Sequence, residues 1–198
     1  GAKSLLFAVV QGGLDPELRL KSLGDLAALD FDGYNIGGLS VGESAKEMYG
    51  VLDYLMPAMP TNKPRYLMGV GYPENIVAAV HRGVDMFDCV IPTREGRHGR
   101  LFSWVAGSDA KLAKALASGK GQDNFYTINN LANQKFASDK KPININSKLP
   151  ELRNYSRAYL HYLFKIDEAL AQRLTTLNNL EFYLDLMAKL RQIIKTNS

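Results

Sequence analysis

The chain has 198 residues, of which 46% are hydrophobic and 22% are charged, so it can bury the core of one domain or of a small pair of domains. Its formal net charge of +4 is mild and only weakly favours a polyanionic partner. The single cysteine, Cys89, excludes an intrachain disulfide, and the apolar run at residues 5–10 is too short to span a membrane or to act as a secretion signal, so we expect a cytoplasmic protein.

The first half of the chain alternates predicted strands with predicted helices. Apolar runs bounded by turn residues predict strands at residues 5–10, 33–36, 65–70 and 86–91. Helices are predicted between them at residues 15–29, 43–55 and 73–81. This alternation predicts a parallel sheet with right-handed crossovers. The buried face of the first helix is predicted from leucines at roughly helical spacing, namely Leu18, Leu20, Leu23, Leu26 and Leu29.

The pattern changes after Trp104. A short helix is predicted at residues 108–118, and residues 119–150 are polar, irregular and rich in asparagine. Two helices are predicted at residues 153–174, with a break near Ile166, and at residues 179–195. We therefore predict three segments: an α/β segment at residues 1–104, an irregular insertion or linker at 105–150, and a helical C-terminal subdomain at 151–198.

An acid closes the last predicted strand. Asp88 follows an apolar stretch, and burying an unpaired carboxylate is costly. It is therefore either a reactive group that faces a substrate or an acid satisfied by backbone N–H groups or by a nearby arginine. A basic cluster follows at once, which suggests nucleic acid, although a solvated surface is the usual role of such runs; it consists of Arg94, Arg97, His98 and Arg100.

Glycines mark the carboxyl ends of the other three predicted strands. In parallel sheets ligands bind at these ends, which here carry residues 11–13, 37–39 and 68–71. Glycine lets the backbone approach a flat ligand closely, and the amide of Gln11 suits the edge of a purine. The alternative is that the glycines only form tight turns. Four strands are half of a closed barrel, so a partner chain, a second copy or a missing segment has to cover the remaining edges.

At these motifs the chain resembles the carboxyl-terminal half of bacterial tRNA-guanine transglycosylase, also called queuine tRNA-ribosyltransferase. The resemblance covers nearly the whole chain except residues 105–150, and its matching stretches are residues 10–12, 31–34, 37–43, 66–71, 85–94 and 153–160. It implies an α/β fold, half of a TIM-type (β/α)8 barrel with four βα units, followed by a mainly helical C-terminal region.

The resemblance also implies a reaction and the residues that perform it. The family exchanges guanine at the tRNA wobble position for a 7-deazaguanine (preQ1 or queuine), in queuosine modification. Asp88 matches the nucleophile that attacks ribose C1′ and forms a covalent ribosyl intermediate. Base-contacting positions are then expected at Gln11, Gly38, Leu39, Glu43, Met68 and Gly69. Arg94 and Arg97 match residues that contact the tRNA anticodon loop, and we extend this expectation to His98 and Arg100 because they belong to the same basic cluster.

Two departures from the family pattern stand out. The family's tail carries a structural zinc site of pattern C-x-C-x-x-C with a distant histidine, and the matching positions here hold Ser147, Leu149, Leu152 and Asn178. Such residues cannot hold zinc, so we expect no metal and no other cofactor. The amino-terminal half, which supplies a second acid and a base-reading aspartate in the family, matches no position.

Three hypotheses remain at this stage. In the first, the chain is the nucleophile-bearing half of a tRNA-guanine transglycosylase, as a split subunit or a fragment, and is catalytically incomplete without the amino-terminal half. In the second, it is a non-catalytic, tRNA-binding accessory subunit of such an enzyme. The third, a metabolite-binding half-barrel unrelated to RNA, leaves the basic cluster unexplained.

Overall fold

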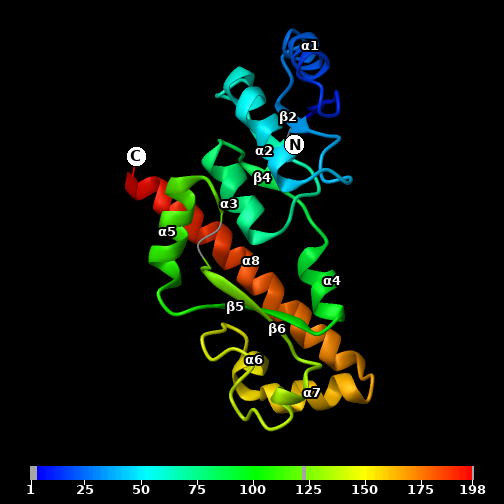
Figure 1. Cartoon of the computed structure of the whole chain (residues 1–198), viewed down its shortest axis with the longest axis vertical. Coiled ribbons are helices and arrows are strands. Elements are labelled where there is room, and N and C mark those ends of the chain that lie inside the picture. The colour runs from blue at the N-terminus through cyan, green and yellow to red at the C-terminus, as the bar shows by residue number, and fades with distance from the viewer. Residues whose placement is uncertain (1–3, 122–123, 198) are drawn as a thin grey trace. The chain divides into compact units, whose positions relative to one another are not determined.

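The structure is a computed structural model that describes residues 4–121 and 124–197. The described residues form two compact units. The sheet unit comprises the chain up to Cys89 together with the stretch that begins at Lys114, and the helical unit comprises the chain from Val90 to Ala113 and the C-terminal part of the chain. Figure 1 shows the elements of both units along the chain.

The sheet unit is built on four parallel strands in the order β1-β2-β3-β4. They are β1 (Phe7–Val10), β2 (Gly33–Ile36), β3 (Arg65–Leu67) and β4 (Met86–Phe87). The register pairs Ile36 with both Val10 and Leu67, and Leu67 in turn with Phe87. The predicted α/β fold with four parallel strands is confirmed.

The fourth strand is shorter than predicted. The prediction of a strand at residues 86–91 is wrong beyond Phe87, because Val90 adopts a helical backbone conformation and Ile91 starts a helix. Pro92 at the second position of this helix has no N–H to donate to a strand ladder and fits the first helical turn. Asp88 therefore stands in the connection between a strand and a helix.

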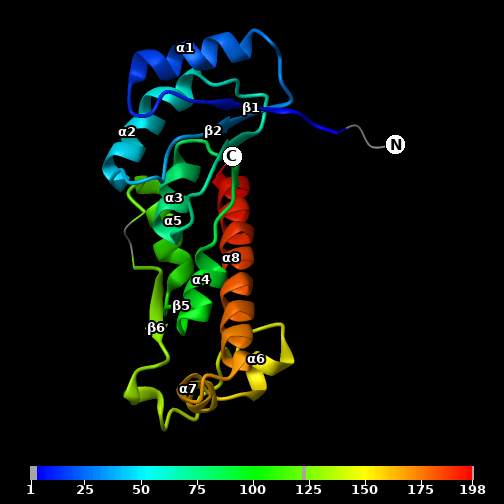
Figure 2. The ribbon, with the colours of Figure 1, turned by 90° about the vertical axis from the view of Figure 1, so that its right-hand side faces the viewer.

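Helices follow the first three strands, as predicted: α1 (Pro16–Ala27), α2 (Ala45–Leu55) with the short 3-10 helix η1 (Met56–Ala58), and α3 (Pro73–His81). Figure 2 shows α1 and α2 beside β1 and β2. The Asp15 side chain caps α1 by accepting the N–H groups of Glu17 and Leu18. Ser44 and Glu47 form a capping box at the start of α2. Local side-chain chemistry thus fixes where each helix begins after the loop that precedes it.

One face of the sheet carries the core and the other is uncovered. Side chains of alternate strand residues are buried against the helices, among them Val10, Ile36 and Leu67. On the opposite face Val9 is 39% exposed and Met86 is 44% exposed. Within the described part of the chain, the buried side-chain oxygen Oδ1 of Asn35 has no hydrogen-bond partner. This second face lacks the covering layer that a complete barrel would give it.

The buried face of α1 differs from the prediction. Leu18, Leu20 and Leu29 are 59%, 40% and 68% exposed, whereas Leu23 is buried and Arg19 is fully buried. Leu23 and Leu26 of the predicted set do pack on the core, and Arg19 shares their helical face. The prediction failed in part because a buried arginine occupies a place where an apolar residue was expected.

The helical unit contains α4 (Ile91–Arg97), β5 (Arg100–Trp104), β6 (Tyr126–Asn130), the 3-10 helix η2 (Gln134–Phe136), α6 (Pro150–Asn154), α7 (Arg157–Lys165) and α8 (Ala169–Asn197). Strands β5 and β6 pair antiparallel, and α8 runs alongside them (Figure 1). The helix predicted at residues 108–118 is confirmed as α5 (Ser108–Ser118), which the two units share. None of the helices in the described residues combines the length and apolar character needed to cross a membrane.

Two predictions for the second half of the chain are corrected. The segment predicted to be irregular at residues 119–150 contains β6. The predicted break near Ile166 is confirmed, but the interruption predicted at residues 175–178 does not exist, because α8 continues through it. Thr175 donates its hydroxyl to the carbonyl of Ala171, and the buried Asn178 and Asn179 bond to groups outside the helix. These polar residues find hydrogen-bond partners without ending the helix.

The side chain of Asn179 hydrogen-bonds α8 to α4 and β5 of the same unit. Its side-chain oxygen accepts the Phe102 N–H at 3.0 Å, and its Nδ2 donates to the carbonyls of Pro92 at 3.0 Å and Arg100 at 2.9 Å. Gly96 of α4 also meets the backbone of Thr176 so closely that a Cβ there would lie 2.9 Å from it. Residues 90–104 therefore pack with the C-terminal helices, and the compact units divide the chain differently from the predicted segment 1–104.

Replacing Asn179 by alanine should lower the free energy of unfolding by about 2–4 kcal/mol, because two buried backbone groups and one partly buried carbonyl lose their partner. Urea unfolding followed by circular dichroism measures the loss. The exposed Asn146 offers a matched control, and Asn146→Ala should change the value by less than about 0.5 kcal/mol. Equal effects of the two substitutions would contradict the role given to Asn179.

Candidate functional site

Asp88 is held by two donors from the neighbouring strand and its loop. The Tyr66 hydroxyl donates to Asp88 Oδ1 at 2.6 Å, and the Gly69 N–H donates to the same oxygen at 2.9 Å. These two bonds hold the pKa of Asp88 below its ordinary value. The bond between Tyr66 and Asp88 also raises the pKa of Tyr66 to about 12. Asp88 is exposed. At neutral pH it is thus an accessible carboxylate beside a protonated phenol.

Gln11 lies against the loop that follows β2. A Cβ on Gly38 would lie 2.6 Å from Gln11 Oε1, and a Cβ on Gly37 would lie 2.7 Å from Gln11 Nε2. Gly38 has a φ of +66° and therefore suits glycine for its backbone conformation as well as for the space available. The Gln11 amide and the Gly37–Gly38 backbone are close neighbours at the ends of adjacent strands.

Ser40 links the β2 loop to the β3 loop. Its hydroxyl donates to the Gly69 carbonyl at 3.3 Å, and its N–H donates to the Glu43 carboxylate, which also accepts the Val41 N–H at 3.1 Å. Burial raises the pKa of Glu43, but the N–H groups of its own loop outweigh burial and hold the pKa below its ordinary value. Ser40 has a φ of +62°, an unusual conformation for a residue with a side chain.

The predicted base-contacting residues thus lie along one rim. Gln11 contacts Gly38, Ser40 joins Glu43 to Gly69, and Gly69 donates to Asp88. Met68, beside Gly69, is 36% exposed, whereas the Leu39 side chain is buried in the core. Only the backbone of Leu39 is therefore available to a ligand. The rim joins the carboxyl ends of the four strands by direct contacts.

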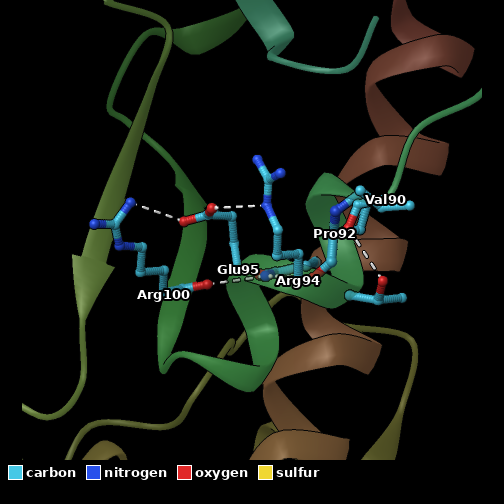
Figure 3. A network of polar contacts seen from close by, with 7 residues as sticks. Val90, Pro92, Arg94, Glu95 and Arg100 are labelled. Carbon is cyan, nitrogen blue, oxygen red and sulfur yellow. Dashed lines mark hydrogen bonds and ion pairs between the residues drawn. The ribbon is translucent and has the colours of Figure 1, made fainter. Parts of the chain in front are cut away.

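The basic cluster belongs to the helical unit. Its predicted members, Arg94, Arg97, His98 and Arg100, are all exposed on α4 and at the start of β5. Figure 3 shows Glu95 between two of them: its carboxylate lies 3.7 Å from Arg94 Nε and 2.9 Å from Arg100 Nη1. Because Glu95 is only 5% exposed, it anchors two guanidinium groups from below and leaves their outer edges in solvent.

Three residues of these sites were missed by the sequence reasoning: Tyr66, Ser40 and Glu95. Strand alternation could have identified Tyr66, which pairs with Met86 in the register and so shares the sheet face that leads to Asp88. Its neighbour Leu67 points to the core instead. No sequence signal marks the positive φ of Ser40. Glu95 lies among three arginines and is indistinguishable by sequence from a solvated acid.

The positions that match the family's zinc ligands hold other bonds. Ser147 Oγ donates to Glu181 Oε2 at 2.5 Å, and Asn178 Nδ2 donates to the Phe102 carbonyl at 2.9 Å. Leu152 is fully buried in the apolar core of the helical unit, and Leu149 packs against the same core. Two aliphatic side chains offer no donor to a metal, so this residue set does not fit zinc. Across residues 4–121 and 124–197, no group of at least three His, Cys, Asp or Glu side chains is arranged to hold a metal ion.

Comparison with known proteins identifies the family. A family model described as queuine tRNA-ribosyltransferase matches residues 1–198. The queuine tRNA-ribosyltransferase of Rickettsia rickettsii (strain Sheila Smith) is 47% identical over 189 residues, which cover 96% of this chain and 46% of the relative. Those of Rickettsia massiliae (strain Mtu5) and Rickettsia prowazekii (strain Madrid E) are 46% and 45% identical over 189 residues. The chain spans about half the length of the curated relatives it matches. It belongs to the queuine tRNA-ribosyltransferase family.

Proposed function

We propose that the chain is the nucleophile-bearing half of an enzyme that exchanges guanine for a 7-deazaguanine at the tRNA wobble position. The observation that carries this proposal is the state of Asp88, an exposed carboxylate kept ionised by Tyr66 and by the Gly69 N–H. It stands on the same rim as Gln11 and Gly38, whose polar groups suit a purine edge.

In the proposed reaction Asp88 takes part in two displacements. Its carboxylate attacks ribose C1′, the bond from C1′ to the guanine nitrogen breaks, and guanine leaves with the bonding electrons. The ring nitrogen of the incoming base then attacks C1′ and gives its proton to the conjugate base of the acid that protonated guanine, while the ester bond to Asp88 breaks and restores the carboxylate. The proton that the departing guanine takes up comes from an acid outside this chain, in the amino-terminal half.

The base would be held by backbone and amide groups. Among the residues that the structure describes, the N–H groups of Gly38 and Leu39 donate to no protein acceptor, which leaves them available to a purine. Gln11 adds both a donor and an acceptor. Met68 and Gly69 would line the same pocket beside Asp88, and Glu43 would be the acid near it that responds to the incoming base.

A partner that supplies the rest of the barrel is part of this proposal. The uncovered sheet face, with Val9 and Met86 exposed and Asn35 Oδ1 unpaired within the described residues, is what such a partner would cover. The partner is an amino-terminal half, whether in the same polypeptide or in a second one. The whole enzyme would bind the anticodon loop of tRNA with the cluster Arg94, Arg97, His98 and Arg100, and would act in the cytoplasm, where tRNA is modified.

The helical unit, we further propose, holds no zinc and uses hydrogen bonds in its place. Glu181 of α8 accepts the Ser147 hydroxyl and, at 2.6 Å, the Lys148 N–H, while Arg153 Nη1 donates to the Ser147 carbonyl at 2.6 Å. These bonds attach the loop before α6 to α8. They support a metal-independent attachment of the same segment that carries the zinc ligands in the family pattern.

Replacing Asp88 by asparagine should reduce guanine exchange by roughly a thousandfold or more, because the amide cannot form the ribosyl ester. The assay follows incorporation of labelled guanine into tRNA by the chain combined with its amino-terminal half. Wild-type protein should also give a tRNA adduct that survives denaturing electrophoresis. The exposed Asp25, paired with Lys21 on α1, gives the control variant Asp25→Asn, which should exchange normally. Unchanged activity in Asp88→Asn would instead favour the accessory-subunit hypothesis.

Replacing Tyr66 by phenylalanine should raise the pKa of Asp88 toward the ordinary aspartate value of about 3.9, because one donor to the carboxylate is lost. Since the folded-state pKa is the lower one, the bond stabilises the fold above the ordinary pKa, and this contribution disappears as the pH falls through the folded value. A carboxyl-carbon NMR titration reports the change. Tyr49, which donates to Asn75 at 2.7 Å, gives the control Tyr49→Phe with an unaltered Asp88 titration. An Asp88 titration unmoved by Tyr66→Phe would refute the assignment.

Metal analysis of the purified protein should find zinc far below a stoichiometric amount, and a chelator should leave its melting temperature unchanged. By contrast, Glu181→Ala should lower the free energy of unfolding by about 1–3 kcal/mol, because it leaves the Ser147 hydroxyl and the Lys148 N–H without their acceptor. The exposed Glu17, in the first turn of α1, provides the control Glu17→Ala. Stoichiometric zinc, or a fall in melting temperature on chelation, would exclude a metal-independent attachment.

A further inference from the structure

Arg19 is a fully buried cation that the proposed reaction does not use. It is 0% exposed and lies in the first turns of α1, directly behind the loops that follow β1 and β2. Burying a guanidinium is costly, and burial lowers the pKa of Arg19, although arginine keeps its proton at neutral pH. A buried guanidinium is tolerated when its N–H groups are hydrogen-bonded, so the acceptors that it binds indicate its role.

The donors of Arg19 bind backbone carbonyls of two different loops. Nε and Nη2 donate to the Gly13 carbonyl at 2.9 and 2.5 Å. Nη1 donates to the Gly37 carbonyl at 3.0 Å and lies 3.5 Å from the carbonyl of Val10, the last residue of β1. One rigid guanidinium therefore fixes the distance between the loop that carries Gln11 and the loop that carries Gly38 and Leu39.

Holding the Gly37 carbonyl also sets the direction of the next N–H. The peptide bond is planar and trans, so the Gly38 N–H points opposite to the Gly37 carbonyl, away from the guanidinium. This N–H donates to no acceptor in the described part of the chain. The bond from Arg19 to the Gly37 carbonyl thus sets the direction of the Gly38 N–H on the other side of the same peptide group.

The packing leaves the two loops little room to move. A Cβ on Gly12 would lie 2.6 Å from the Arg19 backbone nitrogen, and a Cβ on Gly38 would lie 2.6 Å from Gln11 Oε1. The Gly37 N–H donates to the Val10 carbonyl at 3.0 Å. Arg19 is at the centre of this close arrangement and contacts both of its sides.

We propose that Arg19 is a positioning residue of the base pocket: its guanidinium fixes the Gly37 carbonyl and so presents the Gly38 N–H to the purine. This inference rests on the proposed function, because it assigns a task within the same pocket. The planar shape of the guanidinium is needed for this role, because its three nitrogens bind carbonyls of two loops at once. Lysine would keep the charge but could not bind both loops in one fixed geometry.

The test compares Arg19→Lys with Arg82→Lys in the chain combined with its amino-terminal half. Arg82 is a matched control, because it also donates to backbone carbonyls, those of Ala78 and Gly119, but does so at the end of α3. Arg19→Lys should raise the KM for guanine roughly tenfold to a hundredfold and leave the KM for tRNA unchanged, because only the base donor is displaced. Arg82→Lys should change neither KM. If Arg19 had only a structural role, Arg19→Lys would lower the active fraction of the protein, and hence kcat, without raising the KM for guanine relative to the KM for tRNA.

A second measurement reads the loop itself. Amide hydrogen exchange at Gly37 should be faster in Arg19→Lys than in wild type, with the Met68 N–H, which donates to the Ile36 carbonyl at 3.4 Å, as an unaltered reference in the same unit. Arg19→Gln, which keeps an amide donor without the charge, serves if the lysine variant does not fold.

The outcomes distinguish a failure of the proposed function from a failure of the role proposed for Arg19. Wild-type protein that incorporates no base overturns the proposed function and this inference with it. Wild-type activity together with an unchanged guanine KM in Arg19→Lys overturns the inference alone. Failure of both Arg19 variants to fold, while Arg82→Lys folds, would make Arg19 a residue of the fold instead of the pocket.

Discussion

The parallel register of four strands is the constraint on which the candidate site depends. Because the strands run the same way, all four carboxyl ends reach one edge of the sheet, and residues far apart in sequence become neighbours there. Short polar contacts then join these ends: Ser40 to Gly69, Gly69 to Asp88, and Arg19 to both Gly13 and Gly37. The strands supply the alignment, and these contacts convert four separate loops into one surface with defined donors and acceptors.

The same sheet has one face that stays partly exposed. A four-stranded parallel sheet has two outer edges and two faces, and helices α1 to α3 cover only one face. Val9 and Met86 on the other face remain exposed, and Asn35 Oδ1 is buried without a partner in the described residues. Unpaired strand edges and half-covered sheets are normally closed by further chain. The chain spans about half of the length of its relatives, and the partly exposed face is the one that the proposed complementary half would cover.

Sequence reasoning was reliable where local chemistry decides the structure and failed where packing decides it. The proline and acid at residues 16–17 and 73–74 marked helix starts, and glycines marked the strand ends that form the rim. By contrast, only Leu23 and Leu26 of the five leucines predicted to be buried pack on the core, and the buried Arg19 was not foreseen, because its carbonyl partners come from two other loops. Residues 175–178 were predicted as an interruption, yet α8 continues through them, because β5 and α4 supply hydrogen-bond partners to Asn178 and Asn179. Such partners are tertiary and cannot be seen in a local window.

The hydrogen bond from Tyr66 to Asp88 has opposite effects on the two halves of the proposed exchange. In the first displacement the carboxylate is the nucleophile, and a donor that stabilises its charge makes it less reactive. In the second displacement the same carboxylate is the leaving group, and the same donor makes its release from ribose easier. One residue has to serve in both displacements. A ribosyl ester that is too stable would slow the second displacement, just as a carboxylate that is too weak a nucleophile would slow the first. Two donors on a single oxygen, with the pKa of Asp88 lowered, make Asp88 a weaker nucleophile and a better leaving group. Tyr66 pairs with Met86 on the partly exposed face of the sheet, so in the proposed enzyme a complementary half that covered this face would change the polarity around the phenol.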